Sequence, residues 1–353
     1  KITLARIDNY EYLLAKNKDF FKKLGVDFFI YPEMLAAKEI VNSLKRNWVR
    51  QWMEFYGGEL VLIGMKIRNN APLIDKKLEK VFIQDKRMRV VALKRNHETI
   101  LPQGNDVIKA NDIVYFILTK KDIPFLRELT GKEEVNIKNI MIMGASRICL
   151  KTCQYLPSNI KVKIIEKDKE KAHDILEELS NVVVINGDGR DLELLKEEGI
   201  QHMDAFIAVT GSSEANVLAC LTAKRYGVKK TIAEVENIDY ISLAENLDIG
   251  TIINKKIITA SYIYQLTLDA DVTEIKCLTN VDVDVIEFSA KLNSLITKKK
   301  VKNLKLPKDF NIGGIIRNGE GMIVNGDTKI EAEDHVIVFC HASKIRKTEK
   351  YFN

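Results

Sequence analysis

The chain has 353 residues, of which 55 are Lys or Arg and 49 are Asp or Glu; 46% are apolar and 29% are charged. This ordinary globular composition excludes a disordered, collagen-like or disulfide-rich chain, and the length allows two or more cores. The net charge is +6, and the basic residues are interleaved with acidic ones. This charge pattern is only weak evidence for a nucleic-acid partner.

Membrane and disulfide signals are absent from the sequence. No apolar run approaches the roughly 18–20 residues that a membrane helix needs. The five cysteines are odd in number and scattered, without a CxxC pair, and no secretory signal opens the sequence. We therefore expect reduced thiols in the cytosol. Cys149 and Cys153 share a helix face, where packing is favoured over metal binding because no third ligand lies nearby.

The first residues read as if the sequence started inside a domain. Lys1 stands where a start Met is expected, and the apolar residues after it predict a strand with no turn or cap before it. Up to about residue 52 we expect only the last strand pair and helix of an α/β lobe, without the strand and glycine turn that should begin it. The expectation is a fragment, or a chain that pairs with a separately supplied half.

A long helix is predicted after Pro32, because proline favours the first helical position. We expect this helix to bridge two lobes. Its apolar stripe could bury against its own domain or against a partner subunit, and both alternatives stay open. The stripe comprises Met34, Leu35, Ile40, Val41, Leu44, Trp48 and Trp52.

The remaining elements fall into two kinds of lobe. A β-rich lobe is expected over residues 59–131, and another follows residue 268, with Asn318-Gly319 as a hairpin turn. Between them, short apolar runs alternate with helical patterns, which indicates a doubly wound parallel sheet. Its strands are predicted at residues 139–143, 161–166, 182–186, 205–210 and 231–235, and its helices at 168–179 and 213–226. The strands of the last lobe are predicted at residues 282–288, 311–317, 321–324 and 335–339.

An internal repeat orders these lobes. Residues 5–13 align with residues 233–241 at an offset of 228, and residues 88–117 align without gaps with residues 310–339 at an offset of 222. The second alignment keeps Arg95/Arg317, Asn96/Asn318, Glu98/Glu320, Gly104/Gly326, Ala110/Ala332 and Asp112/Asp334 identical. We predict an α/β fold with a Rossmann-like doubly wound parallel sheet plus a smaller β-rich α+β lobe, repeated in tandem with the first copy incomplete. The predicted lobes are residues 1–52, 53–136, 137–266 and 267–353.

The first turn of the complete α/β lobe is the candidate nucleotide site. Small residues there let backbone N–H groups approach a phosphate, and the following helix adds partial positive charge. Of the glycines in G-x-G-x-x-G only Gly144 is present, with Ser146 and Cys149 at the other two places, so a dinucleotide could bind loosely, shifted or not at all. Glu166, at the end of the next strand, could accept hydrogen bonds from ribose hydroxyls or could be a solvated acid.

Two further loops follow strands at the carboxyl edge of the sheet, where ligands bind in such folds. They contain Gly187-Asp188-Gly189 and Thr210-Gly211-Ser212-Ser213, and each could equally be a structural turn. In the first copy Arg6 ends a strand where it could neutralise a phosphate, whereas its repeat counterpart Glu234 would repel one. The two copies are therefore expected to differ in ligand or affinity.

Catalytic motifs are missing from the sequence. None of the five histidines forms HExxH or accompanies a nucleophile elbow, and no Tyr-x-x-x-Lys stands beside the nucleotide-like lobe. His335 and His341, near Cys340, are expected at the edge of a terminal strand. We expect neither a catalytic nor a metal site.

The order of the lobes and four segments resemble the TrkA family, the cytoplasmic nucleotide-binding subunits of bacterial and archaeal Trk potassium uptake systems, built from regulator-of-potassium-conductance (RCK) domains. The segments are residues 5–6, 31–37, 209–216 and 223–225, and the resemblance covers essentially the whole chain. It implies that residues 1–52 are the tail of a first nucleotide lobe, with roughly a hundred residues of a complete protein before them.

The resemblance implies NAD(H) or ATP/ADP as the ligand. The family's glycine turn and acidic strand end map to Gly144, Ala145, Ser146, Arg147, Ile148 and Glu166, and its Ala-Arg position maps to Arg6. Gly187, Asp188 and Thr210 are further candidates. The departures at Ser146, Cys149 and Glu234 count against binding by the second copy.

The implied function is regulatory. Similar domains form rings beneath a membrane pore, and a nucleotide that prefers one ring shape shifts the population of open pores. We expect a non-enzymatic cytoplasmic subunit, peripheral at the inner face of the cell membrane, that forms a symmetric dimer or tetramer and works with a TrkH-like potassium-translocating subunit. The alternatives are a nicotinamide-dependent oxidoreductase whose β-rich lobe holds the substrate, and a ligand-sensing subunit of another cation transporter.

Overall fold

The computed structural model describes the chain except for residues 1–2, 83–86, 97, 267–271, 278–282 and 308–309. The chain forms two compact units, one made of Lys1–Asn47 with Glu134–Ile263 and the other of Trp48–Glu133 with Tyr264–Asn353. Each unit draws on both copies of the repeat. The four lobe boundaries given above stay a prediction.

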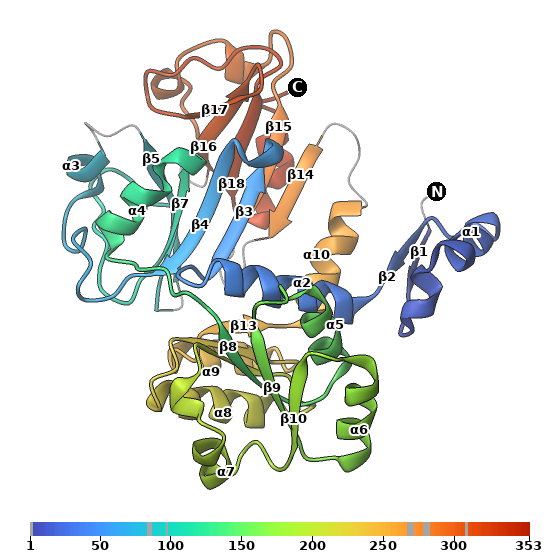
Figure 1. Ribbon diagram of the computed structural model, residues 1–353. Helices are drawn as coiled ribbons and strands as arrows, with labels where there is room; N and C mark the ends of the chain where they lie inside the picture. Colours follow the sequence, from blue (N-terminus) through green and yellow to red (C-terminus); the bar gives the residue numbers. More distant parts are fainter. Residues whose placement is uncertain (1–2, 83–86, 97, 267–271, 278–282, 308–309) are drawn as a thin grey trace. The chain divides into compact units, whose positions relative to one another are not determined.

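A six-stranded parallel sheet forms the centre of the first unit (Figure 1). Its order, β10-β9-β8-β11-β12-β13, is the doubly wound arrangement in which the strand order reverses between β8 and β11. The predicted fold class is thereby confirmed. The strands are β8 (Asn139–Met143), β9 (Lys161–Glu166), β10 (Val182–Asn186), β11 (Ala205–Ala208), β12 (Lys230–Glu234) and β13 (Thr251–Ile253). β11 ends before the predicted residue 210, because the amide of Thr210 bonds to the side chain of Asn216.

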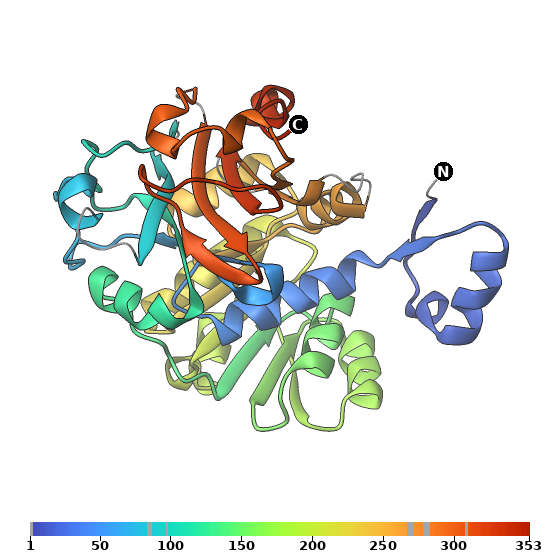
Figure 2. The same cartoon turned by 90° about the horizontal axis from the view of Figure 1, so that it is seen from above.

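Helices cover both faces of this sheet (Figures 1 and 2). On one face Phe206 packs with Cys220 of α8, and on the other Ile142 packs with Ile148 of α5. Because successive side chains of a strand point to opposite faces, strands covered on both sides read as continuous apolar runs. The helices are α5 (Arg147–Tyr155), α6 (Lys169–Glu178), α7 (Leu192–Glu197), α8 (Ser213–Arg225), α9 (Asp239–Asn246) and α10 (Lys255–Leu266).

The first copy contributes two short strands and two helices to this unit. β1 (Leu4–Arg6) and β2 (Phe28–Ile30) pair in parallel in a separate two-stranded sheet, with α1 (Ala15–Lys23) between them in the chain. Through the repeat they correspond to β12, β13 and α9, which agrees with the expected last strand pair of an α/β lobe.

Helix α2 (Pro32–Lys45) buries its apolar stripe within the same chain. Ala36, Ile40 and Leu44 belong to the buried cluster that contains Ile142 of the second copy's sheet. Ile40 and Leu44 of the stripe therefore pack on the lobe of the other copy, and burial of other parts of the stripe against a partner subunit stays an open alternative.

The predicted helix is too long, and the placement of Trp48 and Trp52 on it is wrong. After α2 ends, the side chain of Asn47 exchanges hydrogen bonds of 2.6 and 2.9 Å with the backbone of Val135. These bonds hold the chain outside the helix, and Trp52 lies on β3 (Gln51–Phe55). The helical spacing of the two tryptophans is thus coincidental.

Two five-stranded antiparallel sheets, one from each copy, make up the second unit. Their strand orders match, as β3-β4-β7-β5-β6 and β14-β15-β18-β16-β17, which confirms the repeat in three dimensions. The first sheet contains β3 with β4 (Leu60–Lys66), β5 (Met88–Arg95), β6 (Glu98–Ile100) and β7 (Ile113–Leu118). The second contains β14 (Val272–Cys277), β15 (Asp284–Ser289), β16 (Phe310–Arg317), β17 (Glu320–Ile323) and β18 (His335–Cys340). Short helices α3 (Leu78–Phe82), α4 (Ile123–Thr130) and α11 (Ile345–Glu349) accompany them.

Two details of the second sheet bear on the predictions. Asn318 and Gly319 have φ angles of 52° and 84° and join β16 to β17, so the hairpin turn is confirmed. His335 begins β18, the last strand of the chain, and His341 directly follows it, so both histidines lie at the ends of that strand as expected. The predicted strand start at residue 282 lies outside the described residues.

In each sheet an arginine–aspartate pair, identical in the two copies, fixes the segment that precedes the central strand, β7 or β18. Arg95 donates to both carboxylate oxygens of buried Asp112 at 3.0 and 2.7 Å. Arg317 does the same with buried Asp334 at 2.8 and 2.7 Å. These hydrogen bonds raise the pKa of both arginines.

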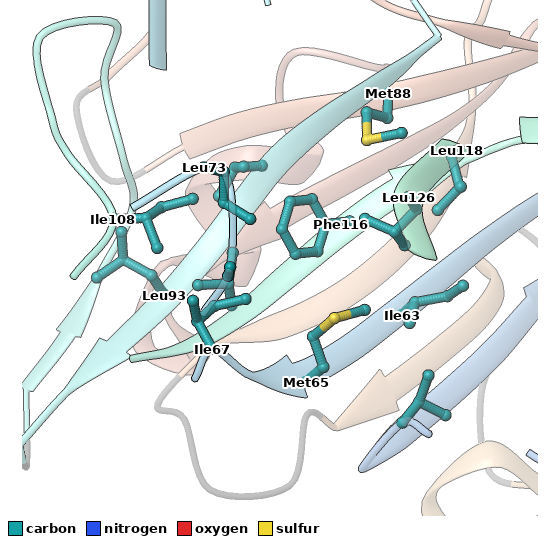
Figure 3. Packing of buried hydrophobic residues seen from close by; sticks show 14 of the residues in the cluster. Ile63, Met65, Ile67, Leu73, Met88, Leu93, Ile108, Phe116, Leu118 and Leu126 are labelled. Carbon is teal, nitrogen blue, oxygen red and sulfur yellow. The ribbon is translucent and has the colours of Figure 1, made fainter. Parts of the chain in front are cut away.

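Each sheet has its own apolar core, and a further cluster joins the two sheets. In the first sheet Phe116 packs among residues such as Met88 and Leu126 (Figure 3). The joining cluster includes Ile117 and Phe339. A Cβ on Gly313 would lie 3.1 Å from side-chain carbons of both Ile117 and Val91 in the first sheet, so glycine lets the two sheets approach at this point.

Candidate functional site

Strand ends of the six-stranded sheet meet around one glycine. Gly144 follows β8 with a φ of 104°, a conformation that other residues rarely adopt. A Cβ on it would lie 3.0 Å from both the Val209 carbonyl oxygen and the Thr210 methyl carbon. Glycine is therefore required, because the turn after β8 presses against the turn after β11 where the strand order reverses.

Helix α5 begins directly after this turn. Ser146 caps it, and its Oγ accepts a hydrogen bond from the N–H of Cys149 at 3.4 Å. The serine at the second glycine position thus has a local role, and the helix N-terminus brings partial positive charge to the turn. Cys149, at the third glycine position, is buried between α5 and the sheet, and a hydrogen bond to Cys153 together with burial raises the pKa of its thiol.

Glu166, at the end of β9, reaches the glycine turn. One of its carboxylate oxygens accepts a hydrogen bond from the N–H of Ala145 at 2.6 Å, and the other accepts one from the N–H of Asp168 at 2.8 Å. The carboxylate is half-buried and bridges two strand ends. It is therefore a built part of the turn and not the solvated acid that was the alternative.

The loop after β10 packs on the strand that carries the turn. A Cβ on buried Gly189 would collide with the side chain of Met143 at the end of β8. Beside it, Arg190 donates to both carboxylate oxygens of Asp188 at 2.9 and 2.6 Å and holds the pKa of that carboxyl well below its usual range. Asp188 is thus neutralised by a neighbour of its own loop.

Thr210 is fixed by a residue that the sequence analysis did not assign to the site. The side-chain oxygen of Asn216 accepts hydrogen bonds from the Thr210 N–H at 3.1 Å and its hydroxyl at 2.7 Å. The Asn216 amide donates to the carbonyls of Thr210 and Glu234 at 3.0 and 2.9 Å. Asn216 therefore ties the ends of β11 and β12 together; its place in the 209–216 segment was the available signal.

The two predicted arginines have different surroundings. Arg147, on the first turn of α5, donates to the backbone carbonyl of Asp8 at 2.7 Å, and Lys151 lies 3.6 Å above the ring of Tyr10. Arg6 is exposed in the two-stranded sheet, and among the described residues no hydrogen bond or ion pair links it to the glycine turn. The segment after β1 thus meets α5 through Asp8 and Tyr10, and not through Arg6.

Glu234, the counterpart of Arg6, is paired with a lysine. Its carboxylate lies 3.2 Å from the Nζ of Lys255, which is also 2.9 Å from Glu236. Burial raises the pKa of Glu234. Burial opposes the charge of Lys255, but hydrogen bonds to both glutamates raise its pKa. Lys255 therefore offsets the repulsion that Glu234 would exert on a phosphate, and the sequence analysis missed it because the partners lie far apart in the chain.

The described residues form neither a metal site nor a membrane-spanning helix. Over the described ranges, no three His, Cys, Asp or Glu side chains are grouped so that they could hold a metal ion. Within the same part of the chain, no helix has both the length and the apolar character to cross a bilayer.

The structure assembles part of the predicted site. Gly144, Ala145, Glu166 and Thr210 meet at the strand-order reversal, and the loop containing Gly187 packs beside them. Ser146 and Arg147 stand on the first turn of α5, whereas Ile148 is buried in the core beneath it. Arg6 stays outside this group.

The chain is similar to known families along most of its length. Residues 140–255 match the TrkA-N domain, and residues 62–131 and 285–353 each match the TrkA-C domain. A Trk system potassium uptake protein TrkA homolog of Methanosarcina mazei is 30% identical over 352 residues, which are 99% of this chain and 78% of that protein. The TrkA protein of Azorhizobium caulinodans is 28% identical, again over 99% of this chain and 78% of its own length.

Solved structures share the fold at low identity. The GsuK RCK domain has a TM-score of 0.55 at 12% identity, and the alignment covers all of this chain and 75% of the GsuK chain. The GsuK channel bound to NAD has a TM-score of 0.53 at 13% identity and covers all of this chain and 62% of its own. These structures show the shared fold, and the domain matches together with the 30% identical relative show that the chain belongs to the TrkA family.

Proposed function

We propose that this chain is a regulatory cytoplasmic subunit of a Trk-type potassium uptake system, which binds NAD(H) or an adenine nucleotide and gates a potassium-translocating membrane subunit. The observation that carries the proposal is the Gly144 turn at the strand-order reversal, with the Glu166 carboxylate bonded to it. Membership of the TrkA family supports the role in potassium uptake.

The residues of the turn fit a dinucleotide. The close approach at Gly144 leaves the first N–H groups of α5 facing the turn, where a pyrophosphate would bind. Ser146 is compatible, because its hydroxyl can donate a hydrogen bond to a phosphate oxygen. Glu166 would exchange its bond to Ala145 for ribose hydroxyls, which favours NAD(H) over a 2′-phosphorylated nucleotide. The bound nucleotide supplies charge and shape to the turn and transfers no hydride in this role.

The coupling to a pore would run through α5. A phosphate at the turn attracts Arg147, whose guanidinium holds the Asp8 carbonyl, so nucleotide binding and the position of the β1 segment are in competition for one cation. In a symmetric ring, a nucleotide that binds one arrangement better than the other shifts the population of open pores by that difference in affinity. A dimer or tetramer with a TrkH-like membrane partner is the assembly we propose.

Titration calorimetry with NADH, NAD and ATP tests the site. Gly144→Val places a branched side chain against Val209 and Thr210 and should abolish the binding heat. Gly227→Ala is the matched control, because Gly227 also has a positive φ, of 91°, but has nothing within 4 Å of an added Cβ. Equal heats for the folded wild-type and Gly144→Val proteins would refute the location, and absence of heat with all three nucleotides would refute the ligand class.

A further inference from the structure

One loop of the second antiparallel sheet has a distinctive surface. Residues 291–305 contain six lysines and no acidic residue. Two leucines of the same loop are exposed, Leu292 at 78% and Leu295 at 47%. Exposed apolar side chains beside a run of cations indicate a surface that meets another phase or molecule.

Local geometry brings the leucines and lysines together. The N–H of Ser294 bonds to the carbonyl of Lys291 at 3.1 Å and closes the turn that carries Leu292. Leu295 starts a 3-10 turn, and because this helix has three residues per turn, Lys298 stands on the same side as Leu295.

Four consecutive or near-consecutive lysines of the loop, at residues 298, 299, 300 and 302, divide into two groups. Lys300 and Lys302 lie 3.5 and 2.7 Å from Asp327, which neutralises part of their charge. Lys298 and Lys299 are exposed and have no ion pair within the described part of the chain. These two are therefore the cations next to the leucines that remain open to an external anion.

The first copy provides an internal comparison, because its loop over residues 68–82 aligns with the second loop at an offset of 223 and shares several of its backbone bonds. The two loops differ where the N–H of Asp75 bonds to the carbonyl of Ile108 and that of its counterpart Lys298 bonds to Leu295. The N–H of Glu79 bonds to the carbonyl of Gly104 at 2.8 Å, as that of Lys302 does to Gly326 at 2.9 Å. The first loop carries Asn69, Pro72, Asp75 and Glu79 where the second carries Leu292, Leu295, Lys298 and Lys302. Lys76 stands where the second loop has Lys299, but the other replacements show that the fold needs neither the two leucines nor Lys298 at these positions.

We propose that the loop over residues 291–305 docks on the anionic face of a lipid bilayer. Lys298 and Lys299 contact the headgroup phosphates, and Leu292 and Leu295 enter the boundary between headgroups and acyl chains. Lysine stems extend along apolar surface while their charges stay at the phosphate level, which suits this arrangement. The proposal is independent of the nucleotide site, and it favours a bilayer over an acidic protein segment because exposed leucines accompany the cations.

Vesicle flotation of the full chain tests the proposal. The probes are vesicles of phosphatidylglycerol and phosphatidylcholine in equal parts, and vesicles of phosphatidylcholine alone. We expect binding to the anionic vesicles at least tenfold tighter than to the neutral ones, weakening as salt is raised. Lys298→Ser/Lys299→Ser and Leu292→Asn/Leu295→Asn should each lower binding roughly tenfold, since each lysine near an anionic surface contributes a severalfold factor.

The matched control is Lys76→Ser/Lys77→Ser in the first loop, which removes the same charge and should change binding less than twofold. Circular dichroism verifies that each variant is folded. Equal binding to both kinds of vesicle, or an equal loss in the control, would overturn the proposal. A different pair of results would indicate an acidic protein partner and overturn the proposal. In that case the leucine variant binds vesicles as well as the wild type does, and a soluble poly-glutamate peptide displaces the chain completely from the vesicles.

Discussion

The buried arginine–aspartate pair of the second antiparallel sheet allows a quantitative test of the repeat. Asp334 is 1% exposed, and Arg317 supplies two charge-assisted hydrogen bonds to its carboxylate at 2.8 and 2.7 Å. Arg317→Met leaves that charge with the N–H of Glu331, at 2.8 Å, as its remaining recorded partner. Removing one member of a buried pair costs about 3–5 kcal/mol. Because the Arg317 side chain is 25% exposed and one donor stays, we expect a loss of about 2–3 kcal/mol.

Tryptophan fluorescence during urea unfolding measures this loss. Trp48 and Trp52 are the only tryptophans of the chain, and both belong to the second unit, so their emission reports on that unit. Arg95→Met should cost a similar amount, because Arg95 holds Asp112 in the same geometry. Lys302→Met, which removes an exposed pair with Asp327 in the same unit, should leave the free energy of unfolding nearly unchanged. A free energy of unfolding for Arg317→Met within 0.5 kcal/mol of the wild type would refute the reasoning.

Three further predictions follow from single contacts. Lys255→Met leaves buried Glu234 without its cation, so we expect a loss of about 2 kcal/mol at pH 7.5 that shrinks toward pH 5. The loss shrinks at low pH because burial raises the pKa of Glu234, so that the carboxyl becomes neutral and no longer needs a cation. Thermal melts followed by circular dichroism measure the loss, and an equal change in melting temperature at both pH values would contradict this prediction. Gly313→Ala should lower stability by about 2 kcal/mol in the fluorescence assay, because the new methyl group meets Phe339, and wild-type stability would disprove that contact. Glu166→Gln should weaken NADH binding by about tenfold in calorimetry with the fold intact, and unchanged affinity would remove Glu166 from the ribose site.

The sequence predicted the sheet of the first unit well because its strands are apolar on both faces. Asn139–Met143 and Lys161–Glu166 have the predicted bounds. The helical spacing of Trp48 and Trp52 led to a predicted helix that is too long. Hydrophobic periodicity contains no information about the bonds between Asn47 and Val135, which hold the chain outside the helix. Those bonds join residues 88 positions apart in the chain.

The sequence predicted which residues belong to the candidate site but not which contacts they make. Gly144 and Glu166 could be placed at neighbouring strand ends from spacing alone. The bond from Ala145 to Glu166, and the reach of Arg147 to Asp8, depend on side-chain rotamers and on packing between the two copies. A single sequence carries no signal for such contacts, because each needs the folded positions of both partners.

The most direct test of the central claim locates the nucleotide without changing the protein. Amide hydrogen exchange of the full chain, with and without saturating NADH, reports which backbone N–H groups the ligand protects. The account predicts protection concentrated at residues 144–149 and at residues 210–216, with little change in the antiparallel sheets. Protection confined to the second unit, or none at the glycine turn when NADH is bound, would contradict it.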